Sequence, residues 1–278
     1  MDEKEQFERL NKYFNFSRWK YNFFLGGSKH FGYYPNKKWI STKKAQELMQ
    51  DLVAEKLQLR KEMKVLDAGC GQGVTSTYIA KKYGCNVEGV TVVPFEIESA
   101  NKLARQSEVS PLVNYSLMDY SNLKFADSYF DAVYTQESLV HSTNIEKTLN
   151  EFHRVLKTEG KIALFEYTMA DDNKFSREEL QAITEMNYAS AMHSFSSMRN
   201  DKFKKLISDT GFRNVKVENI NHNVSPMLES YEKFVKPIYY FLRIFGLTYK
   251  TPNLIAAARM VEFGDKDLVR YNIFTANK

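Results

Sequence analysis

A glycine-rich turn between a predicted strand and a predicted helix constrains the fold of this chain more than any other feature. It reads Asp67-Ala68-Gly69-Cys70-Gly71-Gln72-Gly73 and follows the short apolar run Val65-Leu66. Glycines let the backbone turn sharply and approach a ligand closely, and the N-terminus of the next helix offers unpaired N–H groups. The turn alone is also compatible with a tight connection that binds nothing.

Strands and helices alternate regularly after this turn. Further strands are predicted at 86–90, 112–117, 130–134 and 161–167, with helices at 73–83, 94–107 and 144–157 between them. Such alternation is typical of a parallel sheet. Two more strands, at 213–220 and 270–276, flank helices predicted at 227–246 and 252–262. We therefore predict a Rossmann-like, doubly wound α/β fold with a mostly parallel seven-stranded sheet and an antiparallel last strand.

The chain divides into two predicted parts. Residues 1–60 form a helical N-terminal lid, with helical periodicity over 3–25, an aromatic loop over 30–35 and a helix over 42–58 that Ser41 caps. Residues 61–278 form the Rossmann-like domain, with helical cap insertions at about 173–210 and 221–265.

Charge and cysteine content exclude several classes of protein. The 278 residues carry a formal net charge of +5 without a long Lys/Arg run, which argues against nucleic-acid binding. The two cysteines, Cys70 and Cys85, form neither a metal-binding spacing nor a disulfide framework. The charged N-terminus does not resemble a signal peptide, and no apolar run is long enough to span a membrane. These features predict a cytoplasmic protein without a metal site.

Polar residues at the ends of three predicted strands limit which ligand the glycine-rich turn can bind. Asp67 would repel a pyrophosphate but suits an ammonium group. Thr91 stands where a dinucleotide site is expected to have a ribose-binding acid. Asp119 can accept from an adenine amino group, and Tyr120 can flank the ring. The set favours S-adenosylmethionine over NAD, although a dehydrogenase remains an alternative.

Five segments resemble the class I methyltransferases, and more narrowly the sterol and tocopherol C-methyltransferases. They are Val65–Gly73, Gly89–Pro94, Phe125–Tyr134, Gln136–His141 and Glu151–Lys157. The aromatic N-terminal segment, which includes Tyr13, Trp19, His30 and Phe31, is similar to the lid of those enzymes and of cyclopropane fatty acid synthases.

The resemblance and the strand-end positions together predict the site. Glu137, His141 and Tyr33 are the expected catalytic residues. The expected cofactor contacts are Asp67, Gly69, Cys70, Gly71, Thr91, Asp119, Tyr120 and Gln136. The expected substrate contacts are Tyr13, Trp19, His30, Phe31 and Tyr34.

The reaction expected from this resemblance is C-methylation of an alkene in an isoprenoid, sterol-like or other lipid-like acceptor. Aromatic faces would stabilise the carbocation, and Glu137 or His141 would remove the proton. N- or O-methylation of a small amine or phenol, cyclopropanation, and non-catalytic cofactor binding remain alternatives.

The expected partner is a small hydrophobic substrate. The aromatic segment Tyr231–Tyr249, with Lys233, Lys236 and Arg243, predicts either a cap over this substrate or a peripheral membrane contact. The oligomeric state is left open, a homodimer included.

Overall fold

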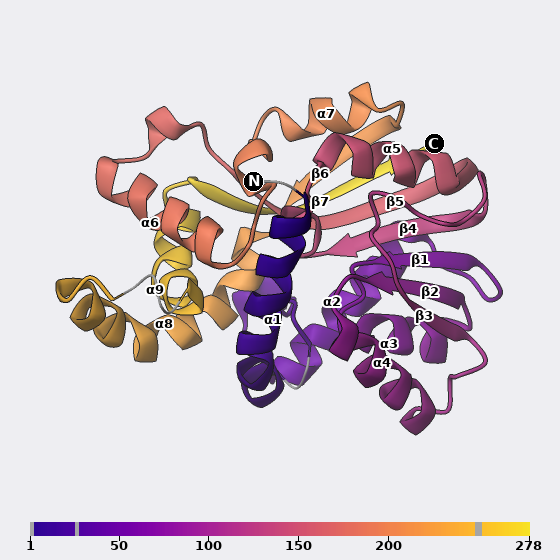
Figure 1. Ribbon diagram of the computed structural model, residues 1–278, viewed down its shortest axis with the longest axis horizontal. Helices are drawn as coiled ribbons and strands as arrows, with labels where there is room; N and C mark the ends of the chain where they lie inside the picture. The colour runs from indigo at the N-terminus through magenta and orange to yellow at the C-terminus, as the bar shows by residue number, and fades with distance from the viewer. Residues whose placement is uncertain (1–2, 26–27, 248–251) are drawn as a thin grey trace.

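A seven-stranded sheet organises the computed structural model, which describes residues 3–25, 28–247 and 252–278 (Figure 1). The strand order is β3-β2-β1-β4-β5-β7-β6. β1 to β5 pair in parallel, whereas β7 is antiparallel to both β5 and β6. The predicted fold class is therefore confirmed. The strands are β1 (Lys64–Ala68), β2 (Asn86–Thr91), β3 (Val113–Leu117), β4 (Phe130–Gln136), β5 (Leu156–Met169), β6 (Arg213–Asn219) and β7 (Val269–Asn277).

Three helices complete the crossovers between the parallel strands. From β1 the chain passes through α3 (Val74–Tyr83) to β2 and through α4 (Pro94–Gln106) to β3, and it then returns to β4 and runs through α5 (Ile145–Val155) to β5. Because crossovers are right-handed, this reversal puts α5 on the opposite face from α3 and α4. The direction of strand order changes between β1 and β4. Their carboxyl ends therefore mark the place where ligands of such sheets bind.

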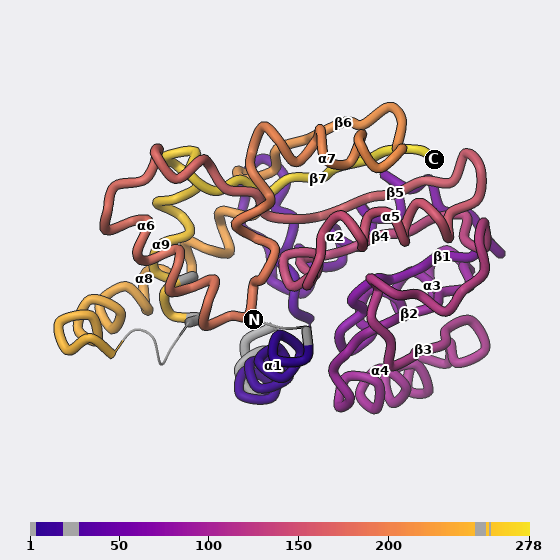
Figure 2. Tube along the Cα trace, turned by 45° about the horizontal axis from the view of Figure 1, so that its top comes forward, coloured from indigo at the N-terminus to yellow at the C-terminus, as the bar shows by residue number. Residues whose placement is uncertain are grey.

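The N-terminal region contains two helices with different surroundings. α1 (Glu3–Leu25) packs through Leu10 and Tyr13 against Ala191, in a cluster separate from the main core. α2 (Thr42–Leu57), which Ser41 caps as predicted, lies against α3 and β5. α1 lies near the carboxyl ends of the central strands, as Figure 2 shows from a second direction.

The region predicted to be helical over about 173–210 is interrupted. α6 (Arg177–Ala189) begins with a capping box between Ser176 and Glu179, and α7 (Phe203–Asp209) follows an irregular stretch. In that stretch the backbone pairs with the end of β5, because Met169 donates to Met198 and accepts from Asn200. These strand-like hydrogen bonds replace the helical ones that the sequence pattern predicted.

Two helices near the C-terminus complete the chain. α8 (Asn221–Ile244) begins six residues before the predicted boundary and is followed by α9 (Pro252–Asp265). Among the described residues, no helix is both long and apolar enough to cross a bilayer.

Candidate functional site

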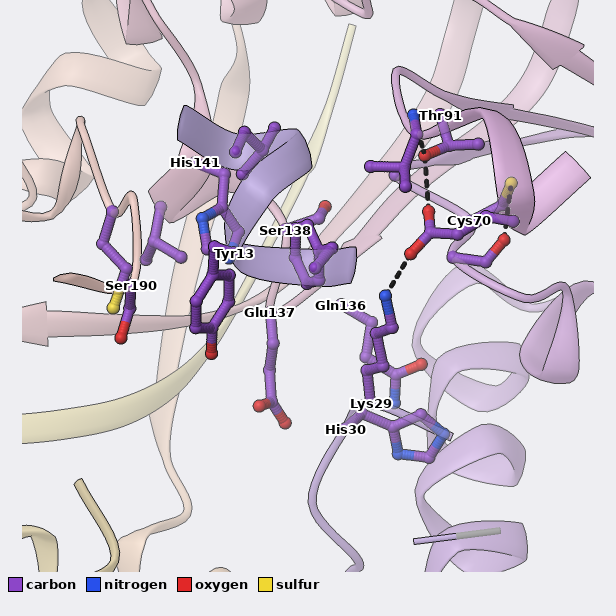
Figure 3. Close-up of a pocket in the computed structure, with 18 of the residues that line it drawn as sticks. Tyr13, Lys29, His30, Cys70, Thr91, Gln136, Glu137, Ser138, His141 and Ser190 are labelled. Atoms are coloured by element: carbon purple, nitrogen blue, oxygen red, sulfur yellow. Dashed lines mark hydrogen bonds and ion pairs between the residues drawn. The ribbon is translucent and has the colours of Figure 1, made fainter. Parts of the chain in front are cut away.

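A cavity of about 520 Å³ opens at the carboxyl ends of β1 and β4 (Figure 3). This volume lies within the range usual for small-molecule sites. The glycine-rich turn and the ends of β2 and β4 form one part of its wall, and α1, α6, α8 and α9 contribute to the other. The cavity therefore joins the strand ends to the helical cap.

The glycine-rich turn needs its glycines for conformation and for space. Gly69, Gly71 and Gly73 all have a positive φ angle, which residues with a side chain rarely adopt. A Cβ on Gly69 would lie 2.4 Å from the Cβ of Ser138, whereas a Cβ on Gly71 would meet nothing nearer than 3.9 Å. The N–H groups of Gly69 and Cys70 donate to Val90 O and hold the turn against β2. The backbone at Gly71 is therefore left open to a ligand.

Polar groups with complementary character stand beside this turn. The Asp67 carboxylate accepts from Ser76, and burial raises its pKa to about 6. Gln136 accepts from the Thr75 hydroxyl at 2.9 Å, but its buried Nε2 has no partner among the described residues. An ammonium group needs an acceptor and a carboxylate needs a donor. The open space at Gly71, the Asp67 acceptor and the Gln136 donor together fit the aminoacyl end of S-adenosylmethionine.

Glu96, which the sequence analysis missed, supplies an acid at the ribose position. It is 3% exposed, comes from the first turn of α4, and accepts from the Thr91 hydroxyl at 2.6 Å. Its other oxygen pairs with Lys29, whose pKa burial lowers. The absence of an acid at position 91 therefore does not count against a dinucleotide, because the acid comes five residues after Thr91. An acidic residue in the first turn after β2 was the available signal.

Asp119 and Tyr120 line the cavity beyond β3, as expected for an adenine subsite. Asp119 accepts from the N–H and hydroxyl groups of Ser121, which fixes its carboxylate. The Tyr120 hydroxyl donates to Ser138 O at 2.9 Å, and its ring packs edge-on against Phe152. Tyr120 thus links the β3 end to the turn that carries Glu137.

The Glu137 carboxyl group, in the wall of the cavity, accepts three hydrogen bonds. One oxygen accepts from the Phe31 N–H at 2.6 Å and the Tyr271 hydroxyl at 3.0 Å, and the other accepts from Tyr167. Burial outweighs these three neutral donors and raises the pKa of Glu137 to about 7. Glu137 is therefore able to gain or lose a proton near neutral pH.

Tyr167 and Tyr271 were not predicted as site residues. They pair directly across β5 and β7, and their rings meet edge to face. Because β7 is antiparallel, its amino end lies at the same edge of the sheet as the carboxyl end of β5. The position of Tyr167 near the end of a parallel strand was the only sequence signal for this pair.

A second buried acidic side chain, that of Glu166, supports the backbone turn that follows Glu137. Glu166 accepts from the N–H groups of Ser138 and Leu139, and burial raises its pKa to about 8. Glu137 itself has a positive φ of 56°. Glu166 therefore helps to hold a backbone conformation that is unfavourable for a residue with a side chain.

His141 lies in the cavity wall in an aromatic environment. Its Nδ1 is 3.0 Å from Ala191 O, and its ring is near those of Tyr13 and Phe14. Burial lowers the pKa of His141 to about 4, so the ring is neutral at pH 7. Of the two predicted bases, Glu137 is better matched to neutral pH.

The predicted aromatic contacts separate into two groups. Tyr13, His30 and Phe31 line the cavity, although both ring nitrogens of His30 already contact Phe31 O and Gln50. Tyr33 and Tyr34 are not part of the cavity wall; Tyr34 is buried against Trp39. The side chain of Trp19 lies outside the part of the chain that is described.

The cap side of the cavity is apolar. α8 contributes Leu228, Tyr231 and Val235 to the wall, and α9 contributes Leu254 and Met260. Metal chemistry has no evident ligand set, because the described residues contain no group of three or more His, Cys, Asp or Glu side chains suited to a metal. Because its cap side is apolar, the cavity suits a hydrophobic ligand.

The buried acids predict how stability depends on pH. Asp67, Glu137 and Glu166 have folded pKa values of about 6, 7 and 8, above their ordinary values of 3.8 and 4.5. From about pH 7 to 8 the folded state therefore binds more protons than the unfolded state, so the free energy of unfolding should fall as the pH rises. His30 and His141 have folded pKa values of about 4 but an ordinary value of 6.5, so in the unfolded state they bind part of a proton near pH 7, which reduces the fall at the lower end of this range without reversing it.

Thermal melts of the ligand-free protein measure this slope. The melting temperature should fall between about pH 7 and 8, and less steeply in Glu166→Gln. Glu159→Gln, at an exposed position, is the matched control and should keep the wild-type slope. A melting temperature that rises over this range would contradict the assignment of raised pKa values.

Comparisons with known proteins agree with this geometry. Residues 66–164 match the family model of a methyltransferase domain. An S-adenosyl-L-methionine-dependent Diels–Alderase of Talaromyces variabilis is 27% identical over 94% of this chain and 91% of its own length. An O-methyltransferase of Aspergillus sclerotiorum is 30% identical over 75% of this chain and 77% of its own length.

Longer relatives and solved structures complete the comparison. The sterol 24-C-methyltransferase of Candida albicans is 31% identical over 66% of this chain, which spans about half (49%) of that enzyme's length. A cyclopropane synthase of Mycobacterium tuberculosis has the same fold, with a TM-score of 0.83, 15% identity and 98% of each chain covered.

Proposed function

Because the chain belongs to the class I S-adenosylmethionine-dependent methyltransferase family, we propose that it methylates a carbon–carbon double bond of an apolar, isoprenoid-, sterol- or other lipid-like acceptor. The observation that carries the proposal is the Glu137 carboxyl. It lies between the polar residues near the turn and the aromatic side of the cavity (Figure 3), with a pKa of about 7.

The cofactor-binding part of the site has a clear division of roles. S-adenosylmethionine supplies an electrophilic methyl group when it is bound. We assign Asp67 and Gln136 to its aminoacyl end, Glu96 and Thr91 to its ribose, and Asp119 to its adenine. When the cofactor is bound, these contacts would fix its position relative to the acceptor, and positioning of this kind can lower a barrier by about 7–11 kcal/mol.

The residues around the acceptor must stabilise a positive charge and then remove a proton. Transfer of the methyl group to the alkene would leave a positive charge on the acceptor, with neutral S-adenosylhomocysteine as the leaving group. The ionised Glu137 and the ring faces of Tyr13 and Phe31 stabilise that charge, each ring by about 0.5–2 kcal/mol. Glu137 then takes the proton whose loss restores the double bond. Tyr33 has no role in this proposal, since it does not line the cavity.

A second candidate is a pericyclic cyclisation that uses the cofactor without consuming it. The Diels–Alderase relative supports it, because the similarity extends over nearly the whole of both chains. In that case the apolar chamber would fold a polyene, and Glu137 with its two tyrosines would polarise a substrate carbonyl.

Labelled cofactor tests the two candidates together. The protein is incubated with S-adenosylmethionine that carries a deuterated methyl group and with separate apolar and polar extracts, and products are identified by mass spectrometry and NMR. The proposal predicts labelled products in the apolar extract with the new methyl on carbon. An unlabelled isomer of an extract component would support the cyclase instead. Label on nitrogen or oxygen, or in a cyclopropane ring, would overturn C-methylation of an alkene.

A further inference from the structure

Helix α8 has an exposed apolar side that the cavity does not use. Phe234, Ile238, Phe241 and Phe245 recur at helical spacing and lie on one side of the helix, and Tyr240 and Ile244 extend it. Phe234 is 78% exposed and Ile244 is 80% exposed. A contiguous apolar surface of this kind usually marks a contact with a partner or a membrane. We call these six residues the α8 stripe.

The inward side of the same helix explains why the stripe is not core. Leu228, Tyr231 and Val235 line the cavity, and Tyr239, at the next helical position, is buried. The apolar wall of the cavity is therefore formed by residues of α8 other than those of the α8 stripe. The C-terminal half of α8 projects from the body of the molecule at the end away from β3 in both views (Figures 1 and 2).

Charge distinguishes between the surfaces that the stripe could meet. Residues 233–247 include Lys233, Lys236 and Arg243 but no acidic residue. Lys236 and Arg243 lie along one border of the stripe, whereas Lys233 lies in line with Tyr240 and Ile244. Lys236 and Arg243 pair with Glu232 and Glu178, yet both remain about 40% exposed. Aromatic residues bordered by basic ones are typical of helices that lie in the interface of an anionic bilayer.

From this arrangement we propose that the α8 stripe docks the protein on the surface of an anionic lipid bilayer. The stripe enters the interfacial region, and the three cations face lipid phosphates. Docking of this kind places the apolar wall of the cavity one helix away from the lipid. The proposal does not depend on methyl transfer, because lipid binding is measured without cofactor or acceptor.

Vesicle flotation with the full chain tests the proposal. We expect binding to vesicles of phosphatidylcholine with phosphatidylglycerol, weaker binding to pure phosphatidylcholine, and further weakening by added salt. The double variant Phe241→Ser/Phe245→Ser should bind about tenfold or more weakly, since two exposed aromatic side chains are lost from the interface. Leu117→Ser, which changes another exposed apolar side chain at the end of β3, is the matched control and should bind like the wild type.

Insertion is measured independently with Phe241→Trp. Its emission should shift to shorter wavelength with anionic vesicles and be quenched by brominated lipid. Absent wild-type binding, or equal binding by the double variant, would overturn the proposal. Light scattering adds one more outcome: concentration-dependent dimers that the double variant abolishes would assign the stripe to a second copy of the chain and overturn lipid docking.

Discussion

Replacing Glu137 by glutamine is expected to lower turnover by about 10²–10⁴-fold, the usual contribution of a positioned acid–base group. Glutamine preserves the shape of the side chain but cannot ionise or take a proton. The described hydrogen bonds of Glu137 go to Phe31, Tyr167 and Tyr271 rather than to the glycine-rich turn. The affinity for S-adenosylhomocysteine, measured by calorimetric titration, should therefore stay within about threefold of the wild-type value.

Tyr271→Phe is the graded companion to this change. It keeps the carboxyl of Glu137 but removes the donor at 3.0 Å that favours its ionised form. The pKa of Glu137 should rise, and the rising limb of the pH–rate profile should move to higher pH. If Glu137→Gln turns over at the wild-type rate, Glu137 has no chemical role and the proposed mechanism fails.

Replacing Gly69 by alanine is expected to weaken cofactor binding by more than about tenfold. The new Cβ would lie 2.4 Å from Ser138 Cβ and 2.6 Å from Ser138 Oγ, at a φ of +91°. Ser138 also donates to Ala68 O at 2.6 Å, so its displacement would disturb β1 and the Glu137 turn together. The backbone conformation adds a strain of about 1–3 kcal/mol.

Two further variants serve as controls. Gly246→Ala also adds a Cβ at a positive φ, of +63°, but lies outside the cavity wall with nothing within 4 Å, so it should fold and bind the cofactor normally. Gly69→Ala/Ser138→Gly removes the two atoms that collide and should recover part of the lost affinity. Calorimetry checks both, with thermal melts to establish folding. Wild-type affinity in Gly69→Ala would contradict the close packing of the two turns.

The sequence predicted the sheet because its signals are local. Runs rich in apolar residues, such as Val65-Leu66 and Phe130–Tyr134, form strands that are buried within the sheet. Between these runs the apolar residues recur with helical spacing, which predicts the helices that connect one parallel strand to the next. The turn at Gly69 and the polar residues that end β1, β2 and β4 follow directly from the same alternation. Local patterns were misleading between 190 and 202, where pairing with the end of β5 replaces the predicted helix.

The partners of the site residues could not be predicted in this way. Glu137 meets Tyr271 only because β7 is inserted between β5 and β6, 134 positions along the chain from Glu137. Lys29 reaches Glu96 only because the N-terminal segment returns across the cavity. Such contacts depend on tertiary packing, and so do the pKa shifts that burial causes.

The protonation of Glu137 is the most direct test of the account, and it can be measured without knowing the acceptor. Carbon-13 NMR of protein labelled at glutamate side-chain carboxyls, with Glu137→Gln to assign the resonance, follows its titration in the ligand-free protein. We expect a midpoint at about pH 7, since burial raises the pKa of Glu137. A midpoint near the ordinary value of 4.5 would show a solvated carboxylate and contradict the proposed role of Glu137.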